Sequence, residues 1–254
     1  MDLRELPRSD FDRHPWETVR ASFFSRLLRE HVNRSGLCAL DMGAGDGFFA
    51  GRLVALVPQV RHVTCFDRGY DEAWLRERTT KPAMLSFTAV RPESRFDVVI
   101  LLDVLEHVAD DRATLREAVS DLLGPRGWLL VSAPAYPSLF SHHDVLLGHK
   151  RRYSPGRLRA LVREAGLAAV EAGQLFASLI LPRALAKLGE VASRRPAPSP
   201  AAHVETALGT WSRGPLVTRG VTAALALDAL CSRRAARRHL PWPGLSTWVL
   251  AQLP

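Results

Sequence analysis

A glycine-rich turn with carboxylates on both sides is the part of this sequence best suited to hold a ligand. It reads Leu-Asp-Met-Gly-Ala-Gly-Asp-Gly from residue 40 to residue 47, and its candidate binding residues are Asp41, Gly43, Ala44, Gly45, Asp46 and Gly47. Glycine lets a backbone turn sharply and approach a ligand closely. In an open α/β sheet, ligands lie beyond the carboxyl ends of the strands, near such a turn. The segment therefore predicts a ligand site.

The spacing of these glycines indicates the kind of ligand. The dinucleotide fingerprint is G-x-G-x-x-G, whose last glycine allows close packing of helix and strand beside a pyrophosphate. Here the pattern is G-x-G-x-G, and Phe48 stands where that last glycine would be. The carboxylates of Asp41 and Asp46 would also repel a pyrophosphate. They suit a ligand that carries a sulfonium and an amino group, and a dehydrogenase is disfavoured.

A second group of reactive side chains lies between residues 141 and 153, which read Ser-His-His-Asp-Val-Leu-Leu-Gly-His-Lys-Arg-Arg-Tyr. His143 is the candidate general base, because free imidazole titrates near neutral pH. Arginine here could hold a phosphate or carboxylate. A histidine beside an acid can equally brace a loop, and Arg-Arg-Tyr can anchor the following helix. The spacing fits no zinc motif, so we expect no metal. The candidates for substrate contact are Asp144, His149, Arg152 and Tyr153.

Apolar runs that alternate with helical patterns predict an α/β fold. Strands are expected at residues 37–41, 60–66, 84–90, 96–102, 128–133, 167–176 and 245–253. Helices are expected at residues 15–34, 48–57, 71–78, 110–123, 155–166 and 216–238. The run Phe96–Leu102 is almost wholly apolar, as a strand buried on both faces should be. This order implies a Rossmann-like, doubly wound, seven-stranded and mostly parallel sheet with helices on both faces.

These motifs resemble those of class I S-adenosylmethionine-dependent methyltransferases of the small-molecule type. The segment Leu40–Gly47 is similar to the first motif of that family. Asp67, at the end of the second strand, matches the acid that binds both ribose hydroxyls, because a carboxylate can accept two hydrogen bonds. The run Asp103–His107 resembles the segment that lines the methionine end of the cofactor.

The resemblance implies S-adenosylmethionine as the cofactor and covers roughly residues 14–182 and the last ten. It adds Arg68, Asp103, Val104 and His107 to Asp67 and the glycine-turn residues as the expected cofactor-binding set. Trp16 and Arg20 resemble the N-terminal helix that lies over the cofactor in the family. One departure concerns adenine, because many relatives carry an acid after the third strand where this chain has Thr88-Ala89-Val90.

The positive charge of the chain is concentrated near its C-terminal end. The formal net charge is +8, and residues 183–240 hold ten Lys or Arg against three Asp or Glu, or +7 of it. We expect residues 1–182 to form the methyltransferase domain, residues 183–240 a basic helical insert and residues 241–254 the final strand. Such an insert could contact an anionic membrane, close over the site, or mediate oligomer formation. The charge interruptions at Arg219 and Asp228 argue against a membrane-spanning helix.

The expected function is methyl transfer to a small or lipid- or glycan-linked acceptor. Methylation of nucleic acid is an alternative prompted by the charge, but the fourth strand ends in Leu-Leu-Asp-Val rather than an Asn/Asp-Pro-Pro-aromatic motif. A non-catalytic cofactor-binding protein of the same fold is a third reading. The polar N-terminus and three scattered cysteines favour a cytoplasmic protein, at most peripheral at the inner membrane face.

Overall fold

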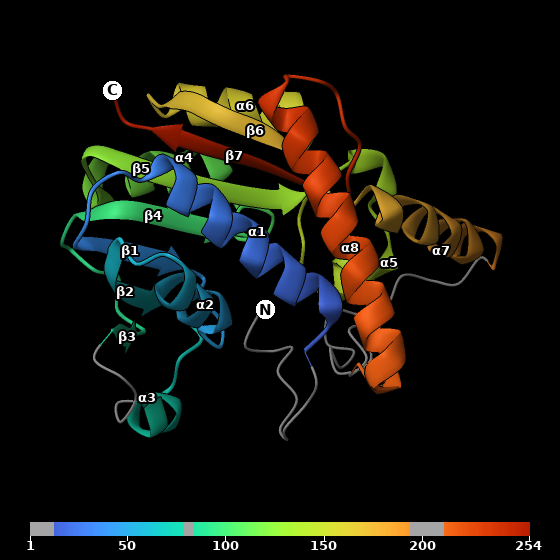
Figure 1. Ribbon diagram of the computed structural model, residues 1–254, viewed down its shortest axis with the longest axis horizontal. Helices are drawn as coiled ribbons and strands as arrows, with labels where there is room; N and C mark the ends of the chain where they lie inside the picture. Colours follow the sequence, from blue (N-terminus) through green and yellow to red (C-terminus); the bar gives the residue numbers. More distant parts are fainter. Residues whose placement is uncertain (1–12, 79–83, 194–210) are drawn as a thin grey trace.

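The computed structural model describes residues 13–78, 84–193 and 211–254, and it contains a single seven-stranded sheet (Figure 1). The strand order is β3-β2-β1-β4-β5-β7-β6, and all neighbours pair in parallel except β7, which is antiparallel to β5 and β6. This confirms the expected fold class. The strands are β1 (Leu37–Met42), β2 (Val60–Phe66), β3 (Leu85–Thr88), β4 (Phe96–Leu102), β5 (Leu123–Pro134), β6 (Ala168–Leu175) and β7 (Ser246–Gln252).

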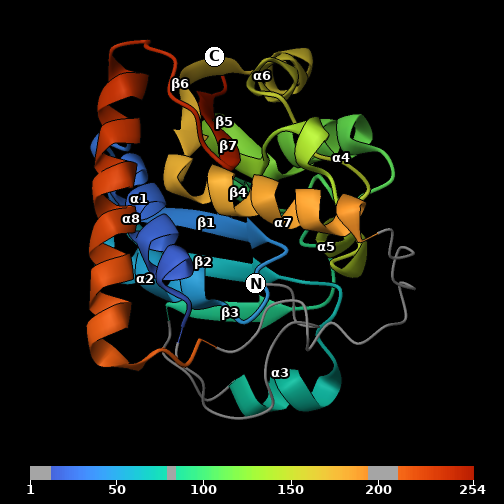
Figure 2. The ribbon, with the colours of Figure 1, turned by 90° about the vertical axis from the view of Figure 1, so that its right-hand side faces the viewer.

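Helices cover both faces of the sheet (Figure 2). One face packs against α1, α2 and α8, and the other against α4 and α6. Two further helices, α5 and α7, lie beyond the carboxyl ends of the central strands, and α3 follows β2. The helices are α1 (Pro15–His31), α2 (Phe48–Leu56), α3 (Glu72–Arg78), α4 (Asp111–Glu117), α5 (His142–Leu146), α6 (Pro155–Glu164), α7 (Ile180–Ala192) and α8 (Gly214–Arg237).

Local sequence signals explain several of these boundaries. Ser154 caps α6, because its hydroxyl accepts a hydrogen bond from the backbone amide of Arg157, and Pro155 is the first helical residue. Asp110 caps α4 in the same manner by accepting from the amide of Ala113. Serine and aspartate are among the residue types that most favour this position. Because β1, β2, β4 and β5 run parallel, their carboxyl ends meet at one edge of the sheet, where the glycine turn lies.

The connection between α4 and β5 differs from the prediction. The helix ends at Glu117, gives way to a π-type turn at Ala118–Leu122, and β5 begins at Leu123 rather than at Trp128. Phe96 pairs with Leu123 while Val98 pairs with Trp128, so the Gly-Pro-Arg-Gly segment is a bulge within the strand. A bulge places extra residues on one strand without ending the pairing. The predicted strand at residues 128–133 is therefore only the second part of β5.

The buried face of α8 is the opposite of the one that the leucine spacing suggests. Leu216 and Leu227 are 81% and 63% exposed, whereas Leu225 and Ala229 are buried. The helix packs on α1 and β6 through small side chains, which permit close approach. At Gly173 on β6, an added Cβ would lie 3.2 Å from the Cβ of Ala236. The side of α8 that carries Leu216 and Leu227 therefore faces solvent.

The helix α7 has its charged side chains turned toward the protein. Arg183 pairs with Asp144, Lys187 donates to the carbonyl of Ser138, and Glu190 accepts from the amide of His142. The opposite side of α7 exposes four large apolar side chains, namely Leu181, Leu185, Leu188 and Val191.

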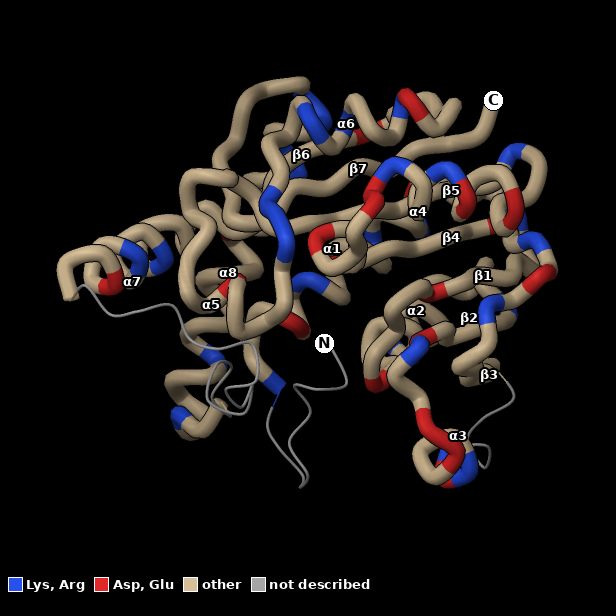
Figure 3. Tube along the Cα trace, turned by 180° about the vertical axis from the view of Figure 1, so that it is seen from behind, with Lys and Arg blue, Asp and Glu red and all other residues tan. Residues whose placement is uncertain are grey.

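The basic charge of the insert is partly neutralised within the fold. Arg233 and Arg237 both pair with Glu30 on α1. Arginines also occur on α3 and α6, among acidic residues (Figure 3). The proline-rich stretch at residues 194–200 lies outside the described residues. Among the described helices, none combines the length and apolar character needed to cross a membrane.

Candidate active site

The glycine turn after β1 is shaped by contacts that leave no room for side chains. Gly43 and Gly47 have φ angles of +71° and +76°, in the left-handed region that glycine adopts most readily. A Cβ at Gly43 would lie 2.8 Å from the Val104 side chain, and one at Gly47 would lie 2.7 Å from Phe87. The turn is therefore wedged between the loop after β4 and a side chain of β3. Both backbone conformation and space require glycine at these two positions.

Asp67 at the end of β2 ties this turn to the neighbouring loop. Its carboxylate accepts hydrogen bonds from the amide of Gly45 at 3.0 Å and from the amide of Gly69 at 2.8 Å. The hydroxyl of Tyr70 donates to the carbonyl of Gly45 at 2.6 Å. A carboxylate offers about four lone-pair sites, so Asp67 keeps acceptor capacity for two ligand hydroxyls.

A large cavity opens at this edge of the sheet. It has a volume of about 1180 Å³ and runs from the glycine turn, past the ends of β2 and β4, to the segments around α5 and α7. Six of the predicted cofactor-binding residues line it: Gly43, Asp67, Arg68, Asp103, Val104 and His107. Thr88, Ala89 and Val90 are not among the lining residues, but Arg91 is.

The other predicted cofactor residues do not line this cavity. Asp41, Ala44 and Asp46 line a separate cavity of about 30 Å³ beneath α1, which is too small for a cofactor. Asp46 pairs with Arg13 and accepts from the amide of Phe48, so its carboxylate orders the turn rather than facing the main cavity. Gly45 lines neither cavity, and its role is to connect the turn to Asp67.

Asp41 is a buried acid without a full countercharge. Its side chain lies at the end of β1 and is 3% exposed. Burial raises the pKa of Asp41 to about 7, and the negative charge of Asp67 adds to this effect, while Arg20 opposes it. A positively charged ligand bound nearby would stabilise the ionised carboxylate.

Arg20 holds α1 against the site. Its guanidinium pairs with Asp103 and lies 4.6 Å from the centre of the Trp16 ring, and all three residues line the cavity. Burial raises the pKa of Asp103, but the nearby guanidinium of Arg20 outweighs it, so the pKa lies below its ordinary value. Trp16 and Arg20 therefore lie where the resemblance places them.

The segment after β5 contributes the other end of the cavity. His143, His149 and Arg152 line it, together with apolar side chains, namely Leu147, Phe176, Leu179 and Leu245. His143, His149 and Arg152 therefore line the same cavity as Gly43 of the glycine turn. A polar wall facing apolar side chains can orient a small organic molecule.

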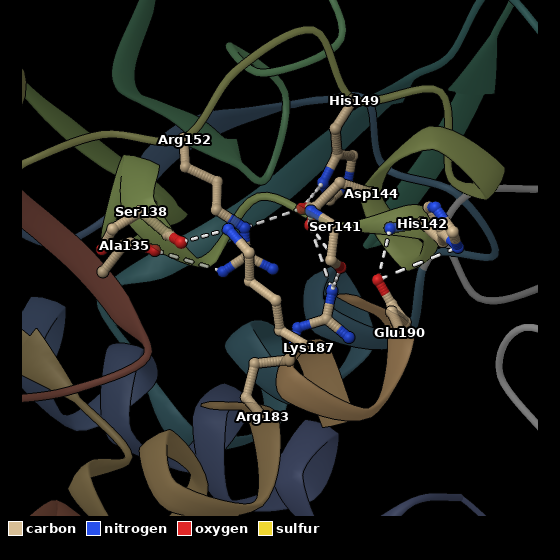
Figure 4. A network of polar contacts seen from close by, with 10 residues as sticks. All are labelled: Ala135, Ser138, Ser141, His142, Asp144, His149, Arg152, Arg183, Lys187 and Glu190. Carbon is tan, nitrogen blue, oxygen red and sulfur yellow. Dashed lines mark hydrogen bonds and ion pairs between the residues drawn. The ribbon is translucent and has the colours of Figure 1, made fainter. Parts of the chain in front are cut away.

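Asp144 and Tyr153 were predicted to contact the substrate, but neither side chain lines the cavity. Asp144 is fully buried and accepts hydrogen bonds from His149 at 2.9 Å, from Arg152 at 2.8 Å and from Arg183 at 3.0 Å (Figure 4). The hydroxyl of Tyr153 is buried and bonded to the carbonyl of Leu105. Both side chains therefore position residues that line the cavity, or the loop beside them, rather than contacting a ligand.

His143 lines the cavity, but it does not titrate near neutral pH. Burial lowers its pKa to about 4, and the positive charge of Arg183 lowers it further, while Asp144 opposes these effects. The imidazole is therefore neutral at pH 7. It can accept a hydrogen bond, but it is a weaker base than the sequence suggests.

Sequence reasoning missed Glu106 as a site residue. Its side chain is fully buried and lines the cavity beside His107. Burial raises the pKa of Glu106 well above its ordinary value, and the charge of Asp103 adds to this effect. The signal was present, because Glu106 lies within the Asp103–His107 run that resembles the family motif.

Comparisons with known proteins agree with this geometry. The profile of a methyltransferase domain family matches residues 15–172. The chain is 33% identical over 124 residues to an uncharacterised methyltransferase of Mycobacterium tuberculosis, covering 46% of this chain and 60% of that protein. It is 26% identical over 147 residues to a ubiquinone biosynthesis O-methyltransferase of Albidiferax ferrireducens, covering 52% and 58%. The chain thus spans about 60% of the length of the curated relatives it matches.

A solved structure shows the same fold over nearly the whole chain. An S-adenosylmethionine-dependent methyltransferase from Mesorhizobium loti aligns with a TM-score of 0.54 and 16% identity, covering 94% of this chain and 98% of that one. Fold and site define a class I S-adenosylmethionine-dependent methyltransferase. The chain belongs to the methyltransferase domain family, which confirms the predicted family.

The described residues fit this cofactor. A Cβ at Gly43 would close the space beside Val104, and Asp67 offers carboxylate oxygens at the cavity wall. Asp103, whose pKa is lowered, also lines this cavity, and its carboxylate suits an amino group or a sulfonium.

Proposed function

We propose that the chain transfers a methyl group from S-adenosylmethionine to a small organic acceptor. The size and lining of the main cavity carry this proposal. A single drug-sized ligand occupies a pocket of roughly 300–1,000 Å³. The cavity here, at about 1180 Å³, has room for the cofactor beside Asp67 and for a second molecule beside His143.

The proposed division of the cavity follows its chemistry. S-adenosylmethionine supplies a methyl group on a sulfonium that is already a good leaving group. Gly43, Asp67 and Asp103 lie at one end and suit the cofactor, whereas Phe176 and Leu179 at the other end suit an apolar acceptor body. Holding two molecules in line accelerates transfer chiefly by removing the cost of bringing them together.

His143 is the proposed group that orients an acceptor hydroxyl. Its imidazole lines the cavity, and its pKa of about 4 leaves it neutral and able to accept a hydrogen bond at neutral pH. His143→Gln retains a polar side chain, whereas His143→Ala does not. We expect His143→Ala to lower kcat/KM about tenfold or more with unchanged cofactor affinity, and His143→Gln to recover part of it. Full activity in His143→Ala would assign the side chain to structure alone.

The acceptor class can be tested without knowing the acceptor. The full chain is incubated with methyl-labelled S-adenosylmethionine and with separated small-molecule, lipid and nucleic-acid fractions of a cell extract. The proposal expects label in the small-molecule fraction. The matched control is Asp67→Ala, which removes an acid from the cofactor wall and should abolish labelling. Labelling confined to nucleic acid, or equal labelling by Asp67→Ala, would contradict the proposal.

A lipid- or glycan-linked acceptor is a second candidate, favoured by the exposed apolar side of α7. Leu181, Leu185 and Leu188 are each more than half exposed on one side of this helix. A helix of this kind can lie in a membrane interface with its apolar side buried. Sedimentation with anionic and with neutral vesicles, at low and high salt, tests this candidate. Absence of binding to anionic vesicles at low salt, or binding that persists unchanged in Leu185→Ser, would remove it.

A further inference from the structure

A carboxylate and two imidazoles meet on the wall of the cavity. Glu106 and His107 follow β4, and His149 follows α5, so the chain brings them together from two loops. One possible ligand atom from each of the three side chains lies within 4.8 Å of the other two. The rings of His107 and His149 are 4.8 Å apart and nearly perpendicular. Their separation along the chain matches no zinc motif, which explains why the sequence pointed to no metal.

The Glu106 side chain makes no hydrogen bond to the residues that the structure describes. Its side chain is fully buried, and neither carboxylate oxygen has a hydrogen-bond partner in the part of the chain that the structure describes. Leaving a carboxyl group buried without a hydrogen bond is costly. The neighbouring acid Asp103, whose charge acts on Glu106, pairs with Arg20 and accepts from the hydroxyl of Ser132. A cation between Glu106 and the two histidines would remove this deficit.

His149 is oriented as metal-binding histidines usually are. Its Nδ1 lies 2.9 Å from a carboxylate oxygen of Asp144. A histidine that binds a metal generally donates its other ring N–H to a carboxylate or carbonyl, which fixes the tautomer and ring direction. Asp144 is itself held by Arg152 and Arg183, so it is ionised and immobile (Figure 4). Because Nδ1 faces Asp144, Nε2 is the ring nitrogen of His149 that can bind an ion.

We propose that Glu106, His107 and His149 bind one divalent transition-metal ion of the zinc type. An ion equidistant from three atoms at most 4.8 Å apart lies at most about 2.8 Å from each, against about 2.0–2.2 Å in a zinc site. Side-chain shifts of about 0.7 Å would complete the geometry. Two imidazoles favour zinc, cobalt or iron over magnesium, which prefers oxygen ligands.

The site would keep a position open toward the cavity. Three protein ligands with a free fourth position are typical of catalytic rather than structural zinc sites. All three residues line the main cavity, on the side of His143 and Arg152. The role of the ion rests on the proposed function: it would bind an oxygen or nitrogen donor of the acceptor and so select acceptors that carry one. The existence of the site does not depend on that role.

Cobalt binding tests the site directly. The full chain is treated with a chelator, freed of it, and titrated with Co²⁺ in the absence of cofactor and acceptor. We expect one equivalent to give visible d–d absorption, which Zn²⁺ abolishes by displacement and Mg²⁺ does not. Glu106→Gln and His149→Gln should each weaken binding at least tenfold. His142→Gln, from a histidine outside the cluster that bonds Glu190, is the matched control and should bind Co²⁺ as the parent chain does.

The outcomes separate the site from the proposed function. No saturable Co²⁺ or Zn²⁺ binding, or binding that survives in both Glu106→Gln and His149→Gln, would overturn the metal site. Circular dichroism of each variant establishes that it is folded before binding is compared. If metal binds as expected but no small molecule is methylated, the proposed function fails and the metal site stands. If a small molecule is methylated but no metal binds, the metal site fails and the proposed function stands.

Discussion

The guanidinium of Arg20 on α1 pairs with the carboxylate of Asp103 at the end of β4, although 83 residues separate them. This pair joins the N-terminal helix to the strand whose end forms the cavity wall. Asp103 adopts a positive φ of 57°, which a non-glycine residue rarely does without support from its surroundings. The pair therefore links the position of α1 to the shape of the cofactor end of the cavity.

Arg20→Met should weaken cofactor binding and stability together. The substitution leaves the partly buried Asp103, whose side chain is 29% exposed, without its cation, and losing a hydrogen bond between charged groups costs about 1.5–3 kcal/mol. We expect a lower thermal midpoint and at least a tenfold loss of affinity for S-adenosylhomocysteine by calorimetry. Arg26→Met, from an exposed arginine of the same helix, is the control and should change neither. Equal behaviour of the two variants would show that the Arg20 pair is unimportant for the site.

Cofactor affinity should depend on pH through Asp41. Without ligand the pKa of this acid is about 7, so it is largely protonated below that pH. A cationic ligand favours the ionised form and lowers the pKa, so binding releases a proton. Affinity should then fall as the pH drops below about 7, by up to tenfold per pH unit, and level off above it.

Calorimetry across this pH range, in buffers of different ionisation enthalpy, measures both the affinity and the proton release. Asp41→Asn is the control, because it cannot titrate and leaves only the ionisation of the ligand itself. A pH dependence that is the same in both proteins would assign the effect to the ligand.

Asp144→Asn should be strongly destabilising. The change leaves Arg152 and Arg183 beside a neutral amide in a buried setting, with an expected loss of about 3–5 kcal/mol in the free energy of unfolding. Glu164→Gln breaks the exposed pair with Arg112 and should cost at most about 1 kcal/mol. Urea denaturation of both variants measures the difference. Comparable losses would mean that the Asp144 network contributes no more than a surface pair.

Truncation of two leucines on α8 should change the free energy of unfolding by very different amounts. Leu225 is 3% exposed, so Leu225→Ala should lower the free energy of unfolding by about 2–5 kcal/mol. Leu227 is 63% exposed, and Leu227→Ala should change it by less than about 0.5 kcal/mol. Thermal and urea unfolding measure both. A large loss for Leu227→Ala alone would mean that the other side of α8 packs against the protein.

Hydrophobic pattern accounts for most of what could be predicted about the fold. β4 is buried on both faces, and its continuous apolar run shows this directly. The glycine turn could also be predicted from the sequence, because the local backbone geometry requires glycine at residues 43 and 47. On α8, by contrast, leucines mark one side and small residues the other. Only the closeness of α1 and β6 decides that the small residues are buried.

The parts of the site that sequence reasoning missed depend on contacts between distant segments. Asp144 lies among polar neighbours, and nothing local indicates that Arg183, 39 residues later, will bury its charge. The sequence predicts Asp46 as a ligand-binding acid. Its pairing with Arg13 could not be foreseen, because that pair forms only in the folded chain. The depressed pKa of His143 likewise follows from burial and from Arg183. Residue type identified the region correctly, but burial decides which side chains face the cavity.

The place of β7 between β5 and β6 has a consequence for synthesis of the chain. Residues 246–252 emerge from the ribosome after the rest of the sheet, yet both neighbouring strands depend on them for hydrogen-bonded partners. Until then β5 and β6 present open edges, which are prone to pair with other chains. Leu245 and Ser246 also complete the cavity wall. Nascent chains arrested before this strand should therefore be aggregation-prone and unable to form the full cavity.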